Sequence, residues 1–167
     1  MVSDNKLRTD RIVFYVRDIE RLDGELDGFL ELSGARVALL IDREGHLVTR
    51  RGDAVQSSLE SISALIAGSF AATREMARLL GEEQFTTLFH QGQRDSIQVS
   101  LVADRALFAM VFDERTNLGL VRYYAVEATR RLHQIMQEMD ERKESSPDAE
   151  LSSDYTENAA AALDKLF

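Results

Sequence analysis

Ser-Ile-Gln-Val-Ser-Leu-Val-Ala-Asp-Arg-Ala-Leu-Phe-Ala-Met-Val-Phe, residues 96–112, is the stretch that decides the fold class. Its first seven residues alternate between polar and apolar side chains, which is typical of a strand with one apolar and one polar face. After a turn at 103–105, residues 106–112 are apolar throughout, as expected for a strand that is covered on both faces. This stretch therefore predicts an antiparallel sheet with helices on both of its faces.

Three further strands are predicted on the N-terminal side of this pair. Residues 36–41 form a near-continuous apolar run, and residues 46–50 alternate after a turn that places Gly45 where φ is positive. Residues 85–91 are predicted to be a strand that turns back at 92–94. The sheet is therefore expected to contain five antiparallel strands.

Two helices are predicted in the N-terminal half, where apolar residues recur at helical spacing. The first covers residues 18–32. The second covers residues 57–80 and is followed by Gly81, the residue type that most often caps the C-terminus of a helix. Its predicted core-facing stripe consists of Leu59, Ile62, Ile66, Thr73, Met76 and Leu80.

A third helix is predicted over residues 118–139, which carry a continuous apolar stripe. Thr116 or Asn117 can cap its first turn, because either side chain can accept a hydrogen bond from an unpaired backbone N–H group. The predicted order of elements is α-β-β-α-β-β-β-α. We expect residues 1–139 to form one α/β domain.

The C-terminal residues are predicted to stand apart from this domain. Residues 140–154 are charged, rich in serine and contain the only proline, so they are expected to form a flexible linker. Residues 155–167 regain an amphipathic helical pattern, and so short a helix is marginal in water unless it docks on something. Either it binds a groove on a partner protein, or it frays or docks on its own domain. Its apolar face consists of Tyr155, Ala159, Leu163, Leu166 and Phe167.

Composition argues against several classes of function. The 167 residues contain no cysteine, which excludes disulfides, thiolate metal sites and thiol catalysis. The formal net charge of −9 makes nucleic acid and anionic lipid poor partners. No apolar run approaches the roughly 20 residues of a membrane-spanning helix, and the polar N-terminus lacks the apolar segment of a secretory signal. We therefore expect a cytoplasmic protein without membrane insertion.

The sequence offers no constellation of catalytic or ligating residues. The three histidines fall in different predicted elements, and no nucleophile elbow accompanies them. Asp104, Asp113 and Glu114 follow strands, but they have neither ligand-like spacing nor a histidine partner. The chain has no Gly-x-x-x-x-Gly-Lys run, so it is not expected to bind GTP itself. We therefore predict no metal, no cofactor and no catalytic residues.

Residues 61–73 of the second predicted helix hold no charged residue over more than three turns. One side of this helix is the core stripe, but the other side also lacks charge, which is unusual for a helix that faces solvent. Either a partner protein covers this second side, or another helix of the same domain does. Its small residues permit close approach of a backbone; they are Ser61, Ala64, Gly68, Ala71 and Ala72.

Three sequence motifs are shared with a known family. The most specific is Phe112-Asp113-x-Arg115-Thr116-x-Leu118-Gly119-Leu120-Val121-Arg122; the others are Phe89-His90-Gln91-Gly92 with Asp95-Ser96, and the terminal Leu163-Asp164-x-Leu166-Phe167. With these motifs the chain resembles the roadblock/LC7 family, and within it the MglB-type regulators of the bacterial Ras-like GTPase MglA. The resemblance extends from about Ile12 to Phe167.

The resemblance implies the roadblock/LC7 fold, a five-stranded antiparallel sheet with helices on both faces, plus a detached C-terminal helix. It also implies a homodimer in which strand 85–91 pairs with its own copy, so that this sheet edge is protected from aggregation. The two copies of the second helix would then form one platform. The implied dimer interface consists of Ala64, Thr86, Thr87, Leu88 and Phe89.

In that family the platform receives a small GTPase of MglA type and accelerates GTP hydrolysis, in the control of cell polarity or gliding motility. Many GTPase activators insert an arginine. This family is thought instead to reposition the GTPase's own residues, and we identify no exposed loop arginine flanked by glycine. Matched onto this chain, the implied GTPase-binding residues are Ala67, Gly68, Ala71, Ala72, Arg74, Glu75 and Arg78.

The resemblance has two further implications, one for the C-terminal helix and one for the location of the protein in the cell. The C-terminal helix is implied to bind the GTPase at a second place and to favour nucleotide exchange, and the protein is implied to act in the cytoplasm or at a cell pole. The alternative to an activator is a non-catalytic scaffold that binds a GTPase or a polarity protein without changing turnover. The two differ in whether GTP hydrolysis becomes faster.

Overall fold

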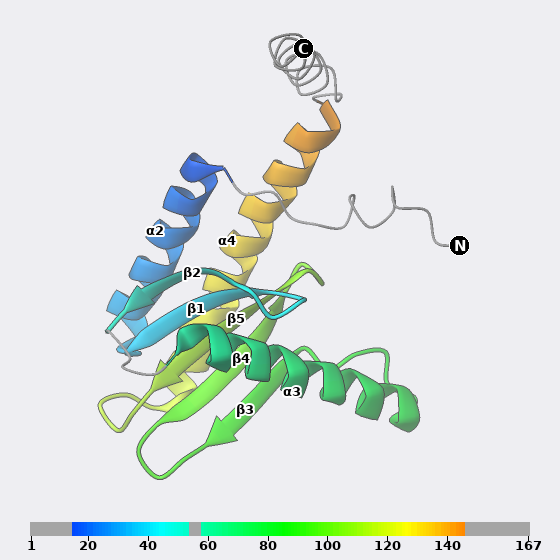
Figure 1. Cartoon of the computed structure of the whole chain (residues 1–167). Coiled ribbons are helices and arrows are strands. Elements are labelled where there is room, and N and C mark those ends of the chain that lie inside the picture. Colours follow the sequence, from blue (N-terminus) through cyan, green and yellow to red (C-terminus); the bar gives the residue numbers. More distant parts are fainter. Residues whose placement is uncertain (1–14, 54–57, 146–167) are drawn as a thin grey trace, which may run out of the picture.

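The computed structural model describes residues 15–53 and 58–145. Its centre is one five-stranded antiparallel sheet in the order β2-β1-β5-β4-β3 (Figure 1). The strands are β1 (Val37–Asp42), β2 (Leu47–Gly52), β3 (Thr87–Gln91), β4 (Ser96–Val102) and β5 (Ala106–Phe112). The bounds of β4 and β5 are those predicted from residues 96–112, which confirms the sheet.

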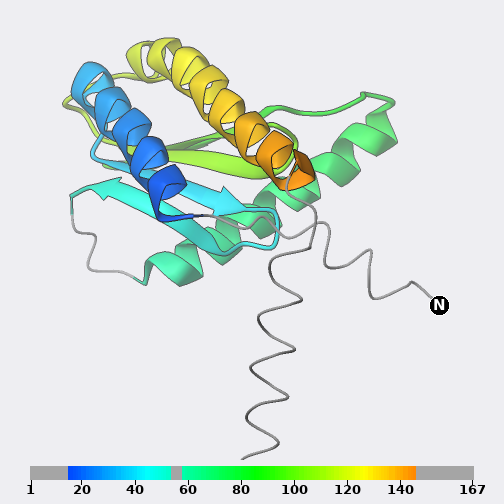
Figure 2. The ribbon, with the colours of Figure 1, turned by 90° about the horizontal axis from the view of Figure 1, so that it is seen from above.

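Two helices cover one face of the sheet and a third covers the other. Helices α2 (Val16–Ser33) and α4 (Leu118–Ser145) lie side by side, and α3 (Leu59–Leu80) lies on the opposite face (Figure 2). This arrangement confirms the predicted order α-β-β-α-β-β-β-α and the predicted fold class. Within the two described ranges, none of these helices has the length and apolar character needed to cross a bilayer.

The two central strands carry a core on each side of the sheet. Leu40 and Phe108 are fully buried in the cluster beneath α2 and α4, where Phe29 meets the edge of the Phe108 ring at 5.0 Å between centroids. Leu39 and Ala109 are fully buried in the second cluster, against α3. Because successive strand residues point to opposite faces, both faces must be apolar, which explains the uninterrupted apolar run of β5.

The polar face of β4 is buried as well. Gln98 and Ser100 are only 1% and 8% exposed, because α4 crosses this part of the sheet. Arg122 of α4 donates a hydrogen bond from Nε to Oε1 of Gln98 at 3.4 Å. Alternation identified the strand correctly, but the polar residues contact a helix and not the solvent.

The helical stripe predicted for α3 is partly wrong. Met76 and Leu80 are 51% and 72% exposed, although the sequence pattern placed both in the core. Ser63, Phe70 and Ala77 are buried in their place, and Thr73 is buried as predicted. The Ser63 and Thr73 hydroxyls can be buried because each donates a hydrogen bond of 2.7 Å to a carbonyl of its own helix. The buried residues of α3 are Leu59, Ser63, Ile66, Phe70, Thr73 and Ala77.

Helix α4 continues beyond its predicted end at 139, as far as Ser145. Residues 140–145, which the sequence analysis assigned to the linker, are therefore helical. They stay helical because their charges pair with other elements: Asp140 with Arg105, and Arg142 with Asp18. Residues 146–167, with the rest of the predicted linker and the C-terminal helix, lie outside the described residues.

Candidate protein-binding surface

The implied GTPase-binding residues lie on the outer surface of α3. Gly68, Ala71, Ala72, Glu75 and Arg78 are exposed, whereas Ala67 and Arg74 are half-buried. Helices α2 and α4 both cover the other face of the sheet, so neither of them packs over this uncharged side (Figure 2). The alternative that another described helix of the domain covers it is therefore wrong.

Local sequence determines where α3 begins and ends. Ser58 caps its N-terminus, with its Oγ accepting from the N–H of Ser61 at 3.5 Å, and Gly81 ends it in the left-handed conformation at φ +74°. The Gly81 cap is confirmed as predicted. Between these caps the helix is 22 residues long, enough to cross the sheet and continue past it.

One flank of α3 contacts two turns of the sheet. The β1–β2 turn packs against Ala64 and Ala67 through Gly45, whose φ is +93° as the sequence predicted. Arg74 lies 3.6 Å from a carboxylate oxygen of Asp104 in the β4–β5 turn. These contacts fix the position of α3 relative to the sheet, and they account for the half-buried state of Ala67 and Arg74.

The other flank of α3 carries an apolar row that the sequence analysis missed. Leu65, Met76 and Leu79 are 71%, 51% and 71% exposed, and Ala72 lies between them at helical spacing. Large apolar side chains on a flank without cover are typical of a protein interface. A signal was available for Leu65, which falls off the predicted core stripe inside the segment 61–73 that lacks charge, whereas Met76 had been assigned to the core.

The C-terminal part of α3 extends past the sheet on the side of β3 (Figure 1). β3 is an edge strand, paired only with β4 among the described strands. Leu88 and Phe89 are half-buried and pack on opposite faces of the sheet, while Thr86 and Thr87 are exposed. Four of the implied dimer residues, Thr86 to Phe89, thus lie together at one free edge, whereas the fifth, Ala64, lies on α3 beside the β1–β2 turn at the other side of the sheet.

The charges beside this edge are largely paired. Arg78 donates from Nε and Nη2 to the Glu75 carboxylate at 2.5–3.1 Å. The Arg78 guanidinium lowers the pKa of Glu75, and the carboxylate raises the pKa of Arg78. The pair is therefore a neutral unit at pH 7, and the surface of α3 stays without net charge there.

The β1–β2 turn, which packs on α3 through Gly45, also holds an exposed arginine, although no glycine flanks it directly. Arg43 is exposed in the β1–β2 turn, two residues before Gly45, and within residues 15–53 and 58–145 its side chain has no ion-pair partner. Gly45 of the same turn is the residue that contacts Ala64 and Ala67 of α3. The role of Arg43 must therefore be tested separately from that of the helix.

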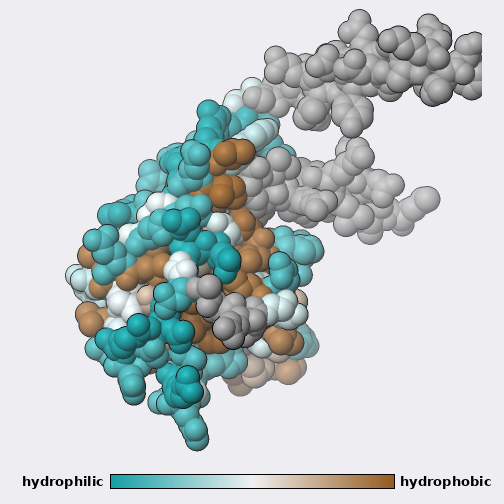
Figure 3. All heavy atoms as spheres, turned by 60° about the vertical axis from the view of Figure 1, so that its left-hand side comes forward, coloured by the Kyte–Doolittle hydropathy of each residue, from teal (hydrophilic) through white to brown (hydrophobic). Residues whose placement is uncertain are grey.

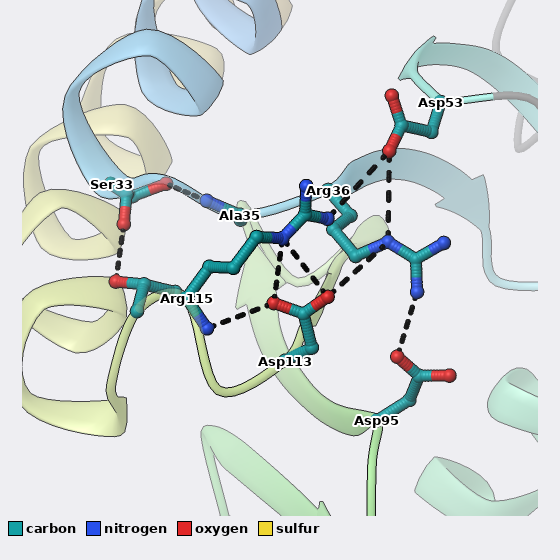
Figure 4. A network of polar contacts seen from close by, with 8 residues as sticks. Ser33, Ala35, Arg36, Asp53, Asp95, Asp113 and Arg115 are labelled. Carbon is teal, nitrogen blue, oxygen red and sulfur yellow. Dashed lines mark hydrogen bonds and ion pairs between the residues drawn. The ribbon is translucent and has the colours of Figure 1, made fainter.

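A second polar cluster lies at the opposite end of the sheet and connects segments that follow several strands (Figure 4). Arg36, just before β1, lies 2.8 Å from Asp95, 3.6 Å from Asp53 and 3.7 Å from Asp113. Arg115 donates to both Asp113 oxygens at 3.0 and 3.1 Å, and it is the largest cause of the lowered pKa of Asp113. The two arginines thus join the segments that follow β2, β3 and β5.

This cluster explains the shared motif in physical terms. The Thr116 hydroxyl donates to the Ser33 carbonyl at 2.6 Å and so fastens the β5–α4 loop to the end of α2. Asn117 accepts from the N–H of Leu120 at 3.0 Å and caps α4, which confirms the predicted cap. Asp113, Arg115, Thr116 and Asn117 therefore stabilise the fold.

One trio of possible metal ligands occurs among the described residues, Asp42, Glu44 and His46 of the β1–β2 turn. The two oxygens of Asp42 already pair with the backbone N–H of His46 at 2.8 Å and with its Nδ1 at 3.1 Å. Asp42 is thus used to close the turn, in the manner usual for this residue type. The trio gives no reason to assign a metal.

Comparison with known proteins identifies the family. The Roadblock/LC7 domain model matches residues 22–112, more than half of the chain. The chain belongs to the roadblock/LC7 family. The matched part of this roadblock/LC7 protein ends just before Asp113, so the motif at 113–122 is additional to it. No curated protein sequence matches the chain.

Solved structures give a closer comparison. The gliding protein MglB from Thermus thermophilus is 36% identical, covers 76% of this chain and 96% of its own, and superposes with a TM-score of 0.72. Myxococcus xanthus MglB is 31% identical over 77% of this chain and 96% of its own, with a TM-score of 0.72. A Roadblock/LC7 domain from Streptomyces avermitilis, at 14% identity and a TM-score of 0.63, shares the fold alone. Members of this group are regulators and not classical enzymes.

Proposed function

We propose that this roadblock/LC7 protein is a homodimeric activator of a Ras-like GTPase of MglA type, which controls cell polarity or motility. The likeness to two MglB proteins at 31–36% identity over about three quarters of the chain supports this assignment. The observation that carries it is the exposed, uncharged side of α3 around Gly68 and Ala71, which no described helix covers.

The dimer is proposed to form at the β3 edge and the overhanging end of α3. Backbone pairing of two β3 strands would extend the sheet and occupy hydrogen-bonding groups that otherwise invite aggregation. The row of Leu65, Met76 and Leu79 needs cover, since these side chains are more than half exposed in the single chain. Two copies of α3 that meet along this row would leave the flank with Ala67 and Ala71 free for the GTPase.

The proposed activator supplies a shaped surface and no catalytic side chain. Arg78 is paired with Glu75, and Arg74 lies beside Asp104, so neither is free to enter a nucleotide site. Small residues at Ala67, Gly68, Ala71 and Ala72 permit close approach of the GTPase backbone. Contact at this distance can hold the switch segments of the GTPase in the arrangement that hydrolyses GTP.

The test is single-turnover release of phosphate from a GTP-loaded MglA-type GTPase, with and without this protein. We expect faster release with the wild type and none of this stimulation with Ala71→Arg, because the long charged side chain separates the two surfaces. Val126→Arg is the matched control, since Val126 is 73% exposed on α4, across the sheet from α3. Unchanged release with a GTPase that binds the wild type would show the scaffold alternative instead.

Substitution of Arg43 distinguishes two mechanisms of activation, one by the α3 surface alone and one by an inserted arginine. If the surface alone acts, Arg43→Ala retains stimulation within a few-fold of the wild type. An arginine inserted into the GTPase would be worth about 10³-fold or more in rate. A loss of that size with unchanged binding would therefore overturn the statement that this chain supplies no catalytic residue.

A further inference from the structure

A groove runs between α2 and α4 on the face of the sheet opposite α3. It opens into a cavity of about 660 Å³ where α2 begins and α4 ends, lined by Asp18, Arg21, Glu138, Arg142 and Ser145 among others. A second hollow of about 470 Å³ follows along the same two helices, beside Gly24. Hydrophilic side chains dominate the side on which α2 lies, with hydrophobic ones at the surface in separate areas (Figure 3).

Ion pairs between the two helices line the groove. Arg21 binds Glu138 at 2.6 Å, and Arg131 lies 3.6 Å from Glu25. At the wide end Arg142 binds Oδ1 of Asp18, a residue that is 0% exposed. Oδ2 of Asp18 is buried without a hydrogen-bond partner in the described part of the chain. A buried carboxylate oxygen of this kind requires a donor, so this end of the groove lacks one polar contact.

Two glycines of α2 leave space along the groove. A Cβ built on Gly24 or Gly28 would meet no atom within 4 Å, although both lie in the middle of a helix, where glycine is unfavourable. The two glycines are four residues apart, so they lie one above the other on α2. A second backbone can therefore approach α2 closely at this place.

The far end of the groove is apolar. Leu32, in the last turn of α2, and Leu120, in the first turn of α4, are 60% and 45% exposed. Tyr123 is 73% exposed and stacks edge to face on Tyr124 with ring centroids 5.1 Å apart. Leu32 lies on the side of α2 that carries Arg21 and Glu25, the residues that pair with α4. The groove thus runs from a charged cavity to an apolar end.

The C-terminal segment of this chain has the length and polarity to fill this groove. It follows directly after Ser145, which lines the charged cavity. The apolar end near Tyr123 is about 33 Å away along α4, at 1.5 Å per residue. Residues 146–154 span up to about 30 Å when extended, so residues 155–167 can lie anywhere along the groove. A returning chain would bring Leu163, Leu166 and Phe167 last, toward Leu32 and Leu120.

We propose that residues 155–167 dock as a helix in the α2–α4 groove of their own chain, antiparallel to α4. The apolar face of the segment covers Gly24, Gly28 and the apolar end, and the residues that precede it cross the charged cavity. The segment is then held on the face of the sheet opposite the α3 platform, away from a bound GTPase. Docking does not depend on the proposed GTPase function, and it is measured on the protein alone.

Disulfide trapping tests this proposal directly, because the chain has no cysteine of its own. The groove pair combines Gly28→Cys with Ala159→Cys: Gly28 accepts a side chain since its Cβ position is open, and Ala159 lies on the apolar face of the segment, four residues before Leu163. The control pair combines Val126→Cys with Ala159→Cys; Val126 is as exposed as Tyr123 but lies roughly 120° round α4 from Glu138, away from α2. We expect the groove pair to close within one chain at least about tenfold faster than the control.

A second pair of variants shows whether the apolar end holds the segment. Leu120→Glu should slow trapping of the groove pair to the rate of the control, whereas Val126→Glu should leave it unchanged. Circular dichroism and thermal melting establish that both variants are folded. Equal rates for the two cysteine pairs would overturn the proposal. Disulfides between chains would also overturn it and assign the groove to the segment of a second copy.

Discussion

A Cβ placed on Gly45 would lie 3.0 Å from the Cα of Ala64, so the β1–β2 turn and helix α3 are in direct backbone contact. The same Cβ would lie 3.3 Å from the Cβ of Ala67. Because both alanines belong to the proposed platform, the turn and the platform form one rigid unit. Two features therefore favour glycine at position 45: its positive φ and the absence of space for a side chain.

Gly45→Ala should destabilise the protein by about 2–4 kcal/mol, because it adds a left-handed backbone cost of about 1–2 kcal/mol to a steric overlap. Chemical denaturation measures this loss. Gly81→Ala is the control: its φ is +74° but a Cβ there meets nothing within 4 Å, so only about 1 kcal/mol is expected. Equal losses at the two glycines would contradict the close contact with α3.

Arg36→Ala should destabilise the fold by about 1–3 kcal/mol, because its charge-assisted hydrogen bond to Asp95 and its ion pairs with Asp53 and Asp113 are lost and three aspartates are left facing one another. Arg36 is 29% exposed, whereas Arg115 is 62% exposed and also contacts two of these carboxylates. Arg115→Ala should therefore cost less, because solvent screens ion pairs of an exposed side chain. Urea denaturation of both variants compares them, and a larger loss for Arg115→Ala would show that Arg36 is not the centre of the cluster.

Elements whose sequence pattern is compatible with only one local structure were predicted correctly. The bounds of β4 and β5, the Gly81 cap and the Asn117 cap follow from alternation, continuous apolarity and local backbone chemistry. Each of these signals depends on residues that are close together in the sequence, so a single amino-acid sequence is enough to interpret them. The family motif added the expectation of a β3 edge, and the structure places β3 there.

The buried face of the platform helix was harder to predict from the sequence, because α3 is apolar on more than one side. With Leu65, Met76, Leu79 and Leu80 all available, a sequence pattern cannot decide which ones face the core, and it chose Met76 and Leu80 wrongly. The end of α4 depends on tertiary contacts: Arg142 is helical because it reaches Asp18, a residue 124 positions earlier in the chain. Neither the packing partner of a helix nor a long-range ion pair is encoded in local spacing.

Glu127 should contribute to stability only above about pH 2. Hydrogen bonds from Arg130 first, and then from Arg131, lower its pKa to about 2 in the folded protein. Since the pKa is lower folded than unfolded, the carboxylate stabilises the fold above pH 4.5, and this contribution fades as pH falls to about 2. The denaturation midpoints of the wild type and of Glu127→Gln should therefore converge between pH 5 and about pH 2. Glu31→Gln, on the exposed side of α2, is the control and should give no such convergence.

Thr87→Pro should yield a folded monomer if the dimer forms through β3. Thr86 accepts a hydrogen bond from the N–H of Leu101 at 2.9 Å, and the backbone groups of alternate residues in an antiparallel pair point to opposite sides. The N–H of Thr87 therefore points away from β4, toward the free edge, so proline removes a donor that only a partner strand would use. Leu88→Pro is the control, because the N–H of Leu88 belongs to the ladder with β4 and its loss should unfold the sheet edge. Sedimentation and thermal melting distinguish the cases, and a stable dimer of Thr87→Pro would place the dimer contact elsewhere.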